Sequence, residues 1–405
     1  MPTLTNIGTL ARCTPAGGQD ALHEIHDAAL TWTDDTITWV GPAAECPPEQ
    51  ATEPVIDAEG ALVIPGLVDA HTHLAFGGWR ADEFAQRLRG VPYLDIAEQG
   101  GGILSTMRAT RAASEDDLLR RCEAFLSEMA QLGVTTVECK SGYGLNVEAE
   151  SKTLRVYERL RERVPQTLIS TFLGAHTIPP EYEDDRAEYI ALLTDTLIPT
   201  VAENNWAAFC DVFVEQGAFT PDEARTICEA GRAHGLQPKL HADQLSDTGG
   251  GALAAELDAA SADHLEHVSA SSIAAMADAD VVAVSLPLAT LYLNESPLPA
   301  RALIEAGVPV AVATDFNPGS APSYHLPFAM TLACTLQRMT PAEVLKGTTA
   351  YAAQSIGCLD TLGSLDPGKR ADFVLVDAPS VNHWMYHLRA NAAIATYIGG
   401  TRVAS

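Results

Sequence analysis

The stretch LVIPGLVDAHTHLAFGGWR, residues 62–80, decides the fold prediction. It begins as an uninterrupted apolar run of strand character and ends with His71 and His73, two residues apart. Because successive side chains of a strand point to opposite faces, these two imidazoles share a face and can bind one ion together. Imidazole is the commonest metal ligand in proteins, and a metal at a strand end is suited to hydrolysis. Two surface histidines after a core strand would give the same pattern. A metal site therefore requires further ligands elsewhere in the chain.

The segment that follows alternates apolar strands with amphipathic helices. Eight strands are expected, at Val63–Ala70, Val134–Lys140, Thr167–Ala175, Phe209–Glu215, Gln237–Ala242, Ala262–Val268, Val281–Leu286 and Val308–Thr314. The helical stretches between them include Glu115–Leu132, Glu148–Arg163 and Pro221–His234. Continuous apolar strands alternating with helices indicate parallel strands buried on both faces. The pattern predicts an α/β fold, a (β/α)8 TIM-type barrel, with an open doubly wound sheet as the alternative.

Both ends of the chain are expected to be β-structure. Leu30–Thr33 and Thr36–Val40 alternate in polarity around an Asp-Asp turn, which is a hairpin signal. Short strands around a Gly-Gly turn recur near the C-terminus. We therefore expect one small β-sandwich domain formed by both termini, although the two ends could also pack separately. The expected division is residues 1–62 and 361–405 for this domain and 63–360 for the barrel.

Composition and charge narrow the class of protein. Of 405 residues, 47% are apolar and 19% charged, as in an ordinary globular chain, and the net charge is −28. So acidic a protein is expected to bind neither nucleic acid nor an anionic membrane. No window is apolar for long enough to span a bilayer, and the N-terminus does not resemble a signal peptide. The eight cysteines form no CxxC pair, so we expect free thiols in the cytoplasm.

Chemistry in a barrel lies at the carboxyl ends of the strands, and at least five of the twelve histidines fall there. The polar residues at the expected strand ends are His71, His73, Lys140, Tyr143, His176, Glu215, His241, His264 or His267, and Asp315. Three histidines and one carboxylate, namely His71, His73, His241 and Asp315, fit a mononuclear metal site. Nitrogen and oxygen ligands with one position open for water suit zinc first and iron(II) second. The alternative roles are a core histidine for His241 and a turn cap for Asp315.

Several motifs carry a family resemblance. VIPGLVDAHTHL, KLHADQ, SADHLEH and ATDFNPGS together resemble the amidohydrolase superfamily. HTHLAFGGWR, GGGILSTMRATR, KSGYGL and TFLGAH extend the resemblance, over most of the chain, to the imidazolonepropionases of histidine breakdown. That resemblance implies hydrolysis of 4-imidazolone-5-propanoate to N-formimidoyl-L-glutamate, with one zinc or iron ion per subunit bound by the four residues above. A homodimer is the assembly expected from related folds.

The same resemblance assigns substrate contacts. Arg80 would bind the propionate carboxylate of the substrate, for which the planar fork of guanidinium donors is well suited. The substrate-binding positions that it implies are Arg80, Tyr143, His176, Gln244, Asn317, Gly319 and Ser320. Structural alternatives are a surface ion pair for Arg80, a half-buried aromatic for Tyr143, a structural hydrogen bond for His176 and a turn for the 317–319 segment.

The candidate catalytic residues are Asp315, His264 and Gln244. Asp315 can accept a proton from the attacking water and pass it to the leaving ring nitrogen, and His264 can stabilise the oxyanion. Gln244 occupies a position where some members of the family carry a glutamate proposed as general base. Because glutamine has no titratable proton, it can only orient water or bind substrate, which leaves the general base open.

Other functions remain possible on the same barrel. A purine or pyrimidine deaminase is disfavoured by Gln244, since deaminases commonly place an acid there. Two-metal cyclic-amide hydrolases resemble one another in a carboxylated lysine at strand four. Here strand four ends in Glu215 and Lys140 falls on strand two, which disfavours a two-metal site. A catalytically inactive binding protein is disfavoured because all four expected metal ligands are present.

Overall fold

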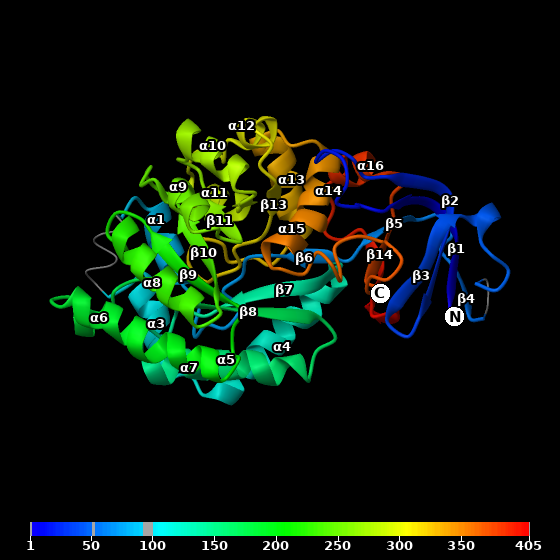
Figure 1. Ribbon diagram of the computed structural model, residues 1–405. Helices are drawn as coiled ribbons and strands as arrows, with labels where there is room; N and C mark the ends of the chain where they lie inside the picture. The colour runs from blue at the N-terminus through cyan, green and yellow to red at the C-terminus, as the bar shows by residue number, and fades with distance from the viewer. Residues whose placement is uncertain (1, 51–52, 92–99, 405) are drawn as a thin grey trace.

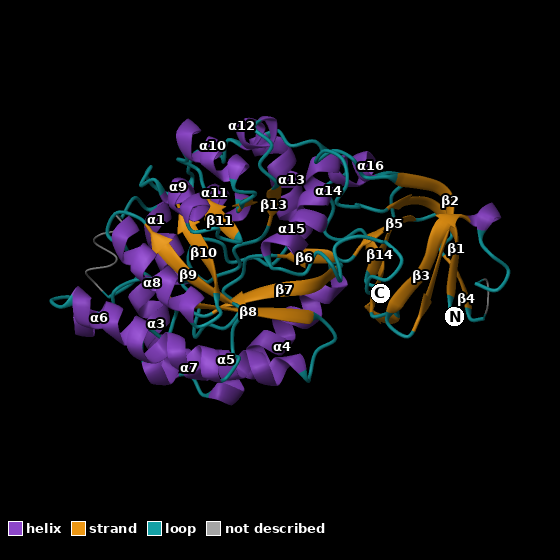
Figure 2. Ribbon diagram, in the orientation of Figure 1, coloured by secondary structure: helices purple, strands orange, loops and turns teal. Residues whose placement is uncertain are grey.

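The structure, a computed structural model, describes residues 2–50, 53–91 and 100–404. These residues form two sheets, one of parallel strands surrounded by helices and one built from the two ends of the chain (Figures 1 and 2). No helix in these ranges is both long enough and apolar enough to cross a membrane.

Eight parallel strands form the barrel in the order β6 to β13, each paired with the next along the chain. Their bounds are β6 Leu67–Asp69, β7 Val134–Lys140, β8 Thr167–Ala175, β9 Phe209–Val214, β10 Gln237–Ala242, β11 Ser261–His264, β12 Val282–Ser285 and β13 Val310–Val312. The barrel closes just beyond its first and last strands, where Thr72 and Phe316 form a parallel bridge and the Thr314 backbone N–H and hydroxyl donate to Asp69 at 2.9 and 2.7 Å. The sequential order and this closure confirm the (β/α)8 prediction, because a doubly wound sheet reverses its strand order.

Helices cover the outside of the barrel (Figure 2). Their bounds are α1 Ala81–Leu88, α3 Ile103–Ala112, α4 Glu115–Gln131, α5 Val147–Arg161, α6 Arg186–Leu192, α7 Ile198–Glu203, α8 Pro221–Ala233, α9 Gly250–Glu256, α10 Ala270–Asp278, α11 Pro287–Leu293, α12 Ala300–Glu305, α13 Leu326–Gln337, α14 Pro341–Gly347, α15 Ala350–Ser355 and α16 Val381–Tyr386. The predicted stretches correspond to α4, α5 and α8. Helix α8 begins with a capping box, in which the Thr220 side chain and Glu223 bond each other's backbone N–H.

The first expected strand, Val63–Ala70, is in fact two strands. Leu62–Pro65 forms β5, which pairs with β1 and β14 in the terminal sheet, whereas β6 belongs to the barrel. The chain passes from the terminal sheet to the barrel at Gly66. A side chain there would clash with Thr135, because a Cβ atom would lie 2.2 Å from Thr135 Oγ1. Apolarity could not reveal this break, because the residues on both sides are buried. The division at 62/63 and 360/361 stays a prediction, with residues 62–65 paired in the terminal sheet.

The terminal sheet has the order β16-β15-β14-β5-β1-β2-β3, with β4 also paired to β1. The remaining bounds are β1 Thr3–Ala11, β2 Glu24–Thr33, β3 Thr36–Pro42, β4 Val55–Asp57, β14 Phe373–Val376, β15 Ala393–Ile398 and β16 Thr401–Ala404. The predicted hairpin is β2–β3, closed by the pair Thr33 and Thr36. The Trp32 ring packs 5.3 Å from Phe373 and 6.2 Å from Tyr397, centroid to centroid. The two termini therefore form one domain, as predicted, and do not pack separately. Their strands belong to one continuous sheet with one core.

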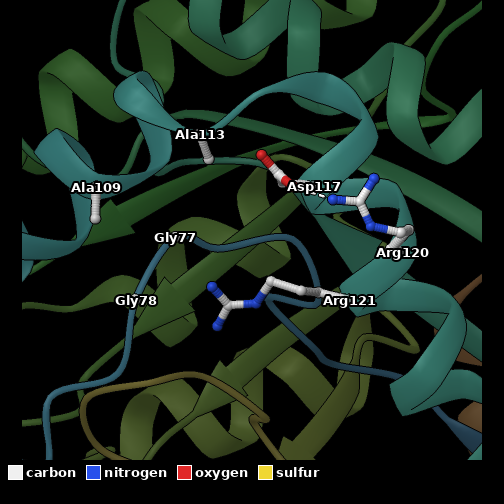
Figure 3. A pocket seen from close by; sticks show the side chains of 7 residues that line it. All are labelled: Gly77, Gly78, Ala109, Ala113, Asp117, Arg120 and Arg121. Atoms are coloured by element: carbon white, nitrogen blue, oxygen red, sulfur yellow. Dashed lines mark hydrogen bonds and ion pairs between the residues drawn. The ribbon is translucent and has the colours of Figure 1, made fainter.

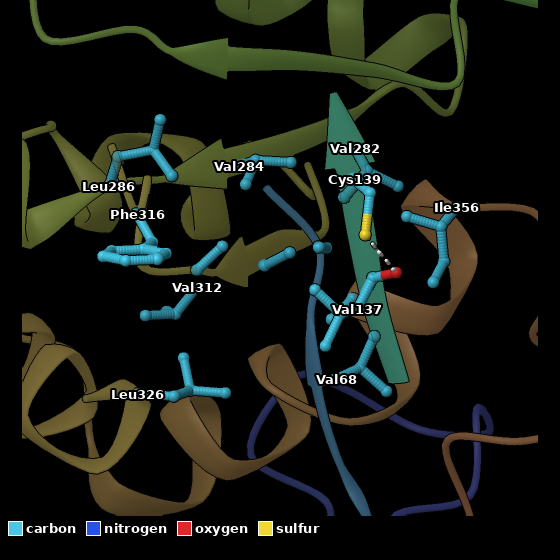
Figure 4. Close-up of a cluster of buried hydrophobic side chains, with 14 of the residues drawn as sticks. Val68, Val137, Cys139, Val282, Val284, Leu286, Val312, Phe316, Leu326 and Ile356 are labelled. Atoms are coloured by element: carbon cyan, nitrogen blue, oxygen red, sulfur yellow. Dashed lines mark hydrogen bonds between the residues drawn. The ribbon is translucent and has the colours of Figure 1, made fainter. Parts of the chain in front are cut away.

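Side chains along the barrel strands alternate between the apolar core outside the sheet and the polar interior of the barrel. On β7, Val137 and Cys139 belong to the apolar core, together with side chains of β6, β12 and α13 (Figure 4). Glu138 and Lys140, on the opposite face of β7, instead contact polar side chains of other barrel strands. The interior of the barrel thus carries charge directly beneath the strand ends. All eight cysteines are free thiols, as expected.

Candidate metal centre

The four predicted metal ligands lie together at the carboxyl ends of three strands. His71 and His73 follow β6, His241 lies at the end of β10, and Asp315 follows β13. The Nε2 atoms of His71 and His73 are 3.3 and 3.4 Å from Asp315 Oδ1. The ring centroids of His71 and His241 are 4.6 Å apart, and all four side chains are buried. The fold therefore brings together ligands from three distant segments of the sequence.

Two of these histidines are oriented by carboxylates behind them. His71 Nδ1 lies 2.6 Å from Asp263 Oδ2, and His241 Nδ1 lies 3.1 Å from Asp211 Oδ1. The Nε2 atoms of both rings are buried without a hydrogen-bond partner. A histidine that binds a metal commonly donates its other nitrogen to a carboxylate in this way. The donor set therefore fits a divalent cation.

The surroundings of His73 and Asp315 favour the protonation states that bind metals. Burial would lower the pKa of His71, but the neighbouring carboxylates of Asp263 and Asp315 raise it. Burial lowers the pKa of His73 to about 4, so its imidazole is neutral. Burial by itself would raise the pKa of Asp315, but the adjacent His71 and His73 rings hold this pKa well below its usual range. A neutral imidazole and an ionised carboxylate are the forms required for coordination.

A buried ionic network lies beneath the cluster. Lys140 Nζ is 2.7 Å from Asp211, 3.0 Å from Glu138 and 3.3 Å from Asp263, and Lys239 Nζ is 2.8 Å from Glu138. Burial alone would lower the pKa of Lys140, but these carboxylates, led by Asp211, raise it. Lys140 thus holds both carboxylates that orient the histidines.

Lys140 lies at a predicted strand end, whereas Asp211 and Asp263 were not among the predicted site residues. The available signal was a carboxylate within each of two otherwise uncharged strand segments, FCDVFV and SADH. A buried charge is costly unless it is paired, so such residues indicate partners inside the fold.

His264 completes the histidine cluster from the end of β11. Its ring centroid is 5.7 Å from that of His71 and 5.4 Å from that of His241. The choice left open at strand six falls on His264, because one of its ring nitrogens lies within 4.8 Å of ring nitrogens of His71 and His241. Burial lowers the pKa of His264 well below its usual value, so the ring is neutral.

Gln244 is buried in the loop after β10. Glu215, at the end of strand four, accepts hydrogen bonds from the backbone N–H groups of Leu245 at 2.8 Å and Ser246 at 3.2 Å. Glu215 therefore fixes the loop that carries Gln244.

Tyr143 and His176 border the metal cluster. The His176 ring is stacked on His73 with centroids 5.1 Å apart, and Tyr143 lies 5.6 Å from His73 and 5.3 Å from His176. His176 Nδ1 also lies 3.0 Å from Gly142 O, so the structural role left open for this histidine is present too. Burial lowers the pKa of His176 well below its usual value. Both side chains are placed to contact a ligand on the cluster.

Arg80 reaches the loop after β13. Its Nε and Nη2 atoms donate to Glu83 Oε2 at 2.9 and 2.8 Å, so the ion pair considered for this residue exists. The guanidinium also lies against Gly319, where a Cβ atom would be 2.3 Å from Nη1. Glycine at this position thus leaves room for the Arg80 side chain.

Asn317 shapes the same loop. Its Oδ1 accepts from the backbone N–H groups of Gly319 and Ser320, both at 2.8 Å, and its Nδ2 donates to Asp315 O at 2.6 Å. The Ser320 hydroxyl lies 3.4 Å from Asp315 Oδ2. The turn expected here is present, and it joins the predicted substrate loop directly to the predicted metal ligand.

A separate cavity of about 450 Å³ lies between the loop after β6 and helices α3 and α4 (Figure 3). Its lining residues are Gly77, Gly78, Ala109, Ala113, Asp117, Arg120 and Arg121. The Arg121 guanidinium lies 5.2 Å from the centroid of the Phe76 ring, which forms part of the core. Since no predicted site residue lines this cavity, we do not assign it to the metal centre.

Comparison with known proteins agrees with the motifs. A family model described as "Amidohydrolase family" matches residues 62–403. The chain belongs to the amidohydrolase family. Two relatives of this amidohydrolase are named imidazolonepropionase. The one from Geobacillus kaustophilus is 47% identical over 380 residues, 93% of this chain and 90% of the relative. The one from Shouchella clausii is 50% identical over 336 residues, 83% of this chain and 75% of the relative.

Solved amidohydrolase-like structures share the fold. A zinc-bound adenosine deaminase from Xanthomonas campestris matches 99% of this chain and 92% of its own with a TM-score of 0.74 and 18% identity. An atrazine chlorohydrolase from Arthrobacter aurescens, complexed with zinc, matches 99% and 95% with a TM-score of 0.76 and 17% identity. At this identity the likeness supports the architecture of the amidohydrolase alone.

Proposed function

We infer that this amidohydrolase is an imidazolonepropionase. It hydrolyses the cyclic amide C–N bond of 4-imidazolone-5-propanoate to N-formimidoyl-L-glutamate, the third step of histidine degradation. The observation that carries this conclusion is the 47–50% identity to imidazolonepropionases over most of the chain. The clustered histidines and aspartate at the strand ends support it independently.

We propose that His71, His73, His241 and Asp315 bind one zinc or iron ion per subunit. The buried Nε2 atoms of His71 and His241, which have no hydrogen-bond partner, support this assignment. Zinc is the first candidate, because three histidines and a carboxylate suit it. When bound, such an ion acts as a Lewis acid and makes water more acidic.

The chain's own groups would move the protons. Asp315 is ionised and lies beside two of the histidines. It accepts a proton from water while the oxygen of that water bonds to the ring carbonyl carbon. His264 donates a hydrogen bond to the carbonyl oxygen as negative charge develops there. The C–N bond then breaks, and the proton passes from Asp315 to the leaving nitrogen. This leaves an open formimidoyl group and a carboxylic acid, which releases the second proton of water to solvent as it ionises. Gln244 orients water or substrate, so we assign the general base to Asp315.

Substrate orientation falls to the residues around the cluster. Arg80 binds the propionate carboxylate, which a chain of net charge −28 would otherwise repel. Tyr143 and His176 face the ring of the substrate. Asn317, Gly319 and Ser320 contact it from the loop after β13. The convergence of Arg80 and Gly319 supports this arrangement.

We propose that the enzyme works in the cytoplasm as a homodimer on a small molecule, without a nucleic-acid or membrane partner. The net charge of −28 supports the absence of a nucleic-acid or anionic-membrane partner, and the eight free cysteines support the cytoplasm. The homodimer is the assembly expected from related folds.

The decisive test is to supply 4-imidazolone-5-propanoate to the purified protein and to quantify formiminoglutamate, with and without chelator. The expected result is turnover that chelator abolishes and that zinc or iron(II) restores. Metal bound without turnover would favour an inactive binding protein, and release of ammonia would favour a deaminase.

A further inference from the structure

The turn after β11 has an unusual backbone. His264 and Leu265 both adopt positive φ, at 79° and 69°, although neither is glycine. The turn is fastened to the end of β10, because Leu265 N–H donates to Ala242 O at 3.0 Å and His267 N–H to Asp243 O at 2.9 Å. Side-chain-bearing residues persist in this conformation only where surrounding contacts fix it, and they concentrate at functional sites. The turn places the His264 and Glu266 side chains beside each other.

Two buried polar atoms in this turn face each other without hydrogen-bond partners. They are His264 Nδ1 and Glu266 Oε2, which lie 3.9 Å apart. The other carboxyl oxygen, Glu266 Oε1, accepts from the hydroxyl of Thr290 on α11 at 2.9 Å. Because leaving a buried donor or acceptor unpaired is costly, a small rotation that pairs these two atoms is favoured.

We propose that Glu266 is a positioning residue for His264, donating a hydrogen bond from Oε2–H to Nδ1 so that Nε2 carries the proton toward the reacting oxygen. A ring nitrogen of His264 lies within 4.8 Å of ring nitrogens of His71 and His241, at the centre of the cluster. The inference deepens the imidazolonepropionase assignment and rests on it. It accounts for the proton on Nε2 that His264 needs in order to donate a hydrogen bond to the oxyanion.

The surroundings of both groups support a neutral pair. Burial raises the pKa of Glu266 to about 8; the Thr290 hydrogen bond opposes this, and the charges of Asp315 and Glu295 add to it. Burial also keeps His264 neutral. Since Oε1 already accepts from Thr290, the acid proton belongs on Oε2. As pH rises through the pKa of Glu266, the ionised carboxylate would accept from Nδ1–H instead, and Nε2 would lose its proton.

The test compares kcat and KM of the zinc-loaded wild type, Glu266→Gln, Glu266→Ala and Glu295→Gln from about pH 6 to about pH 10. Glu266→Gln keeps a neutral donor, so its kcat at neutral pH should stay within about threefold and lack the alkaline fall of the wild type. Glu266→Ala should lose about a hundredfold in kcat with little change in KM. Glu295→Gln, a control on an exposed acid whose charge raises the pKa of Glu266, should retain the alkaline fall and shift it to lower pH.

A second readout is the tautomer of His264, observed by ¹⁵N NMR of labelled metal-loaded protein. The Nε2–H form is expected at neutral pH in the wild type and in Glu266→Gln. An Nδ1–H tautomer in the wild type, or an alkaline limb unchanged in Glu266→Gln, would overturn the inference. A wild type that binds metal and fails to open the cyclic amide would instead reject the proposed function, while the NMR measurement would still decide the role of Glu266.

Discussion

His241 contributes a buried imidazole whose Nδ1 faces Asp211 and whose Nε2 has no hydrogen-bond partner. His241→Ala should therefore lose the metal and the activity together, with turnover falling by at least about a hundredfold. Metal analysis and the formiminoglutamate assay on the same sample check this. His234→Ala, on an exposed histidine, is the control and should change neither. Full metal content with full turnover in His241→Ala would remove this residue from the site.

Variants of Arg80 test its proposed contact with the substrate carboxylate. Loss of charge-assisted hydrogen bonds to a carboxylate weakens the free energy of substrate binding by about 2 kcal/mol. Arg80→Ala should therefore raise KM about thirtyfold and leave kcat nearly unchanged. Arg80→Lys should give an intermediate KM, because an ammonium keeps the charge without the planar fork. Steady-state kinetics separate these effects. An unchanged KM in both variants would leave Arg80 as the ion-pair partner of Glu83 alone.

At the residue scale, the sequence predicted the groups that stand at strand ends and missed those inside strands. His71, His241 and Asp315 could be found because position at a strand end has a chemical meaning in a barrel. Asp211 and Asp263 are marked only as carboxylates within otherwise uncharged strands. Their partners could not be predicted, because these depend on which strands are neighbours across the interior, and periodicity carries no information about that.

At the scale of elements, Lys140 on β7 joins the carboxylates of β9 and β11. Lys140→Met leaves these buried carboxylates uncompensated, which should cost about 3–5 kcal/mol of stability and weaken zinc binding about tenfold to a hundredfold. Thermal unfolding and competition with a chelator measure the two effects. The double variant Lys140→Met with Asp211→Asn should recover part of the stability, since it removes one of these charges. Zinc affinity unchanged in Lys140→Met would separate the network from the metal centre.

Most elements followed from apolar patterns, helix caps and turn chemistry, as α8 and the β2–β3 hairpin illustrate. The break between β5 and β6 did not. An apolar run signals burial but not the partner against which it is buried, and Gly66 adapts to Thr135, a neighbour that only the folded chain supplies.

At the scale of the whole molecule, the net charge of −28 destabilises the compact state through self-repulsion. Sodium chloride screens charges over about 10 Å at 0.1 M and about 3 Å at 1 M. The unfolding temperature should therefore rise between these concentrations. Calorimetry at fixed pH and metal content checks the trend. A fall in unfolding temperature over the same range would mean that the surface ion pairs outweigh the repulsion.

The pairing of β5 with β14 has a consequence for biosynthesis. Leu62–Pro65 emerges early from the ribosome, yet its neighbour Phe373–Val376 is made only after every strand of the barrel. The edge of β5 that pairs with β14 stays unpaired for nearly the whole of translation, because contacts between such distant segments form last. A nascent chain arrested before that late strand should thus be a preferred client of chaperones, and release of the finished polypeptide should end the interaction.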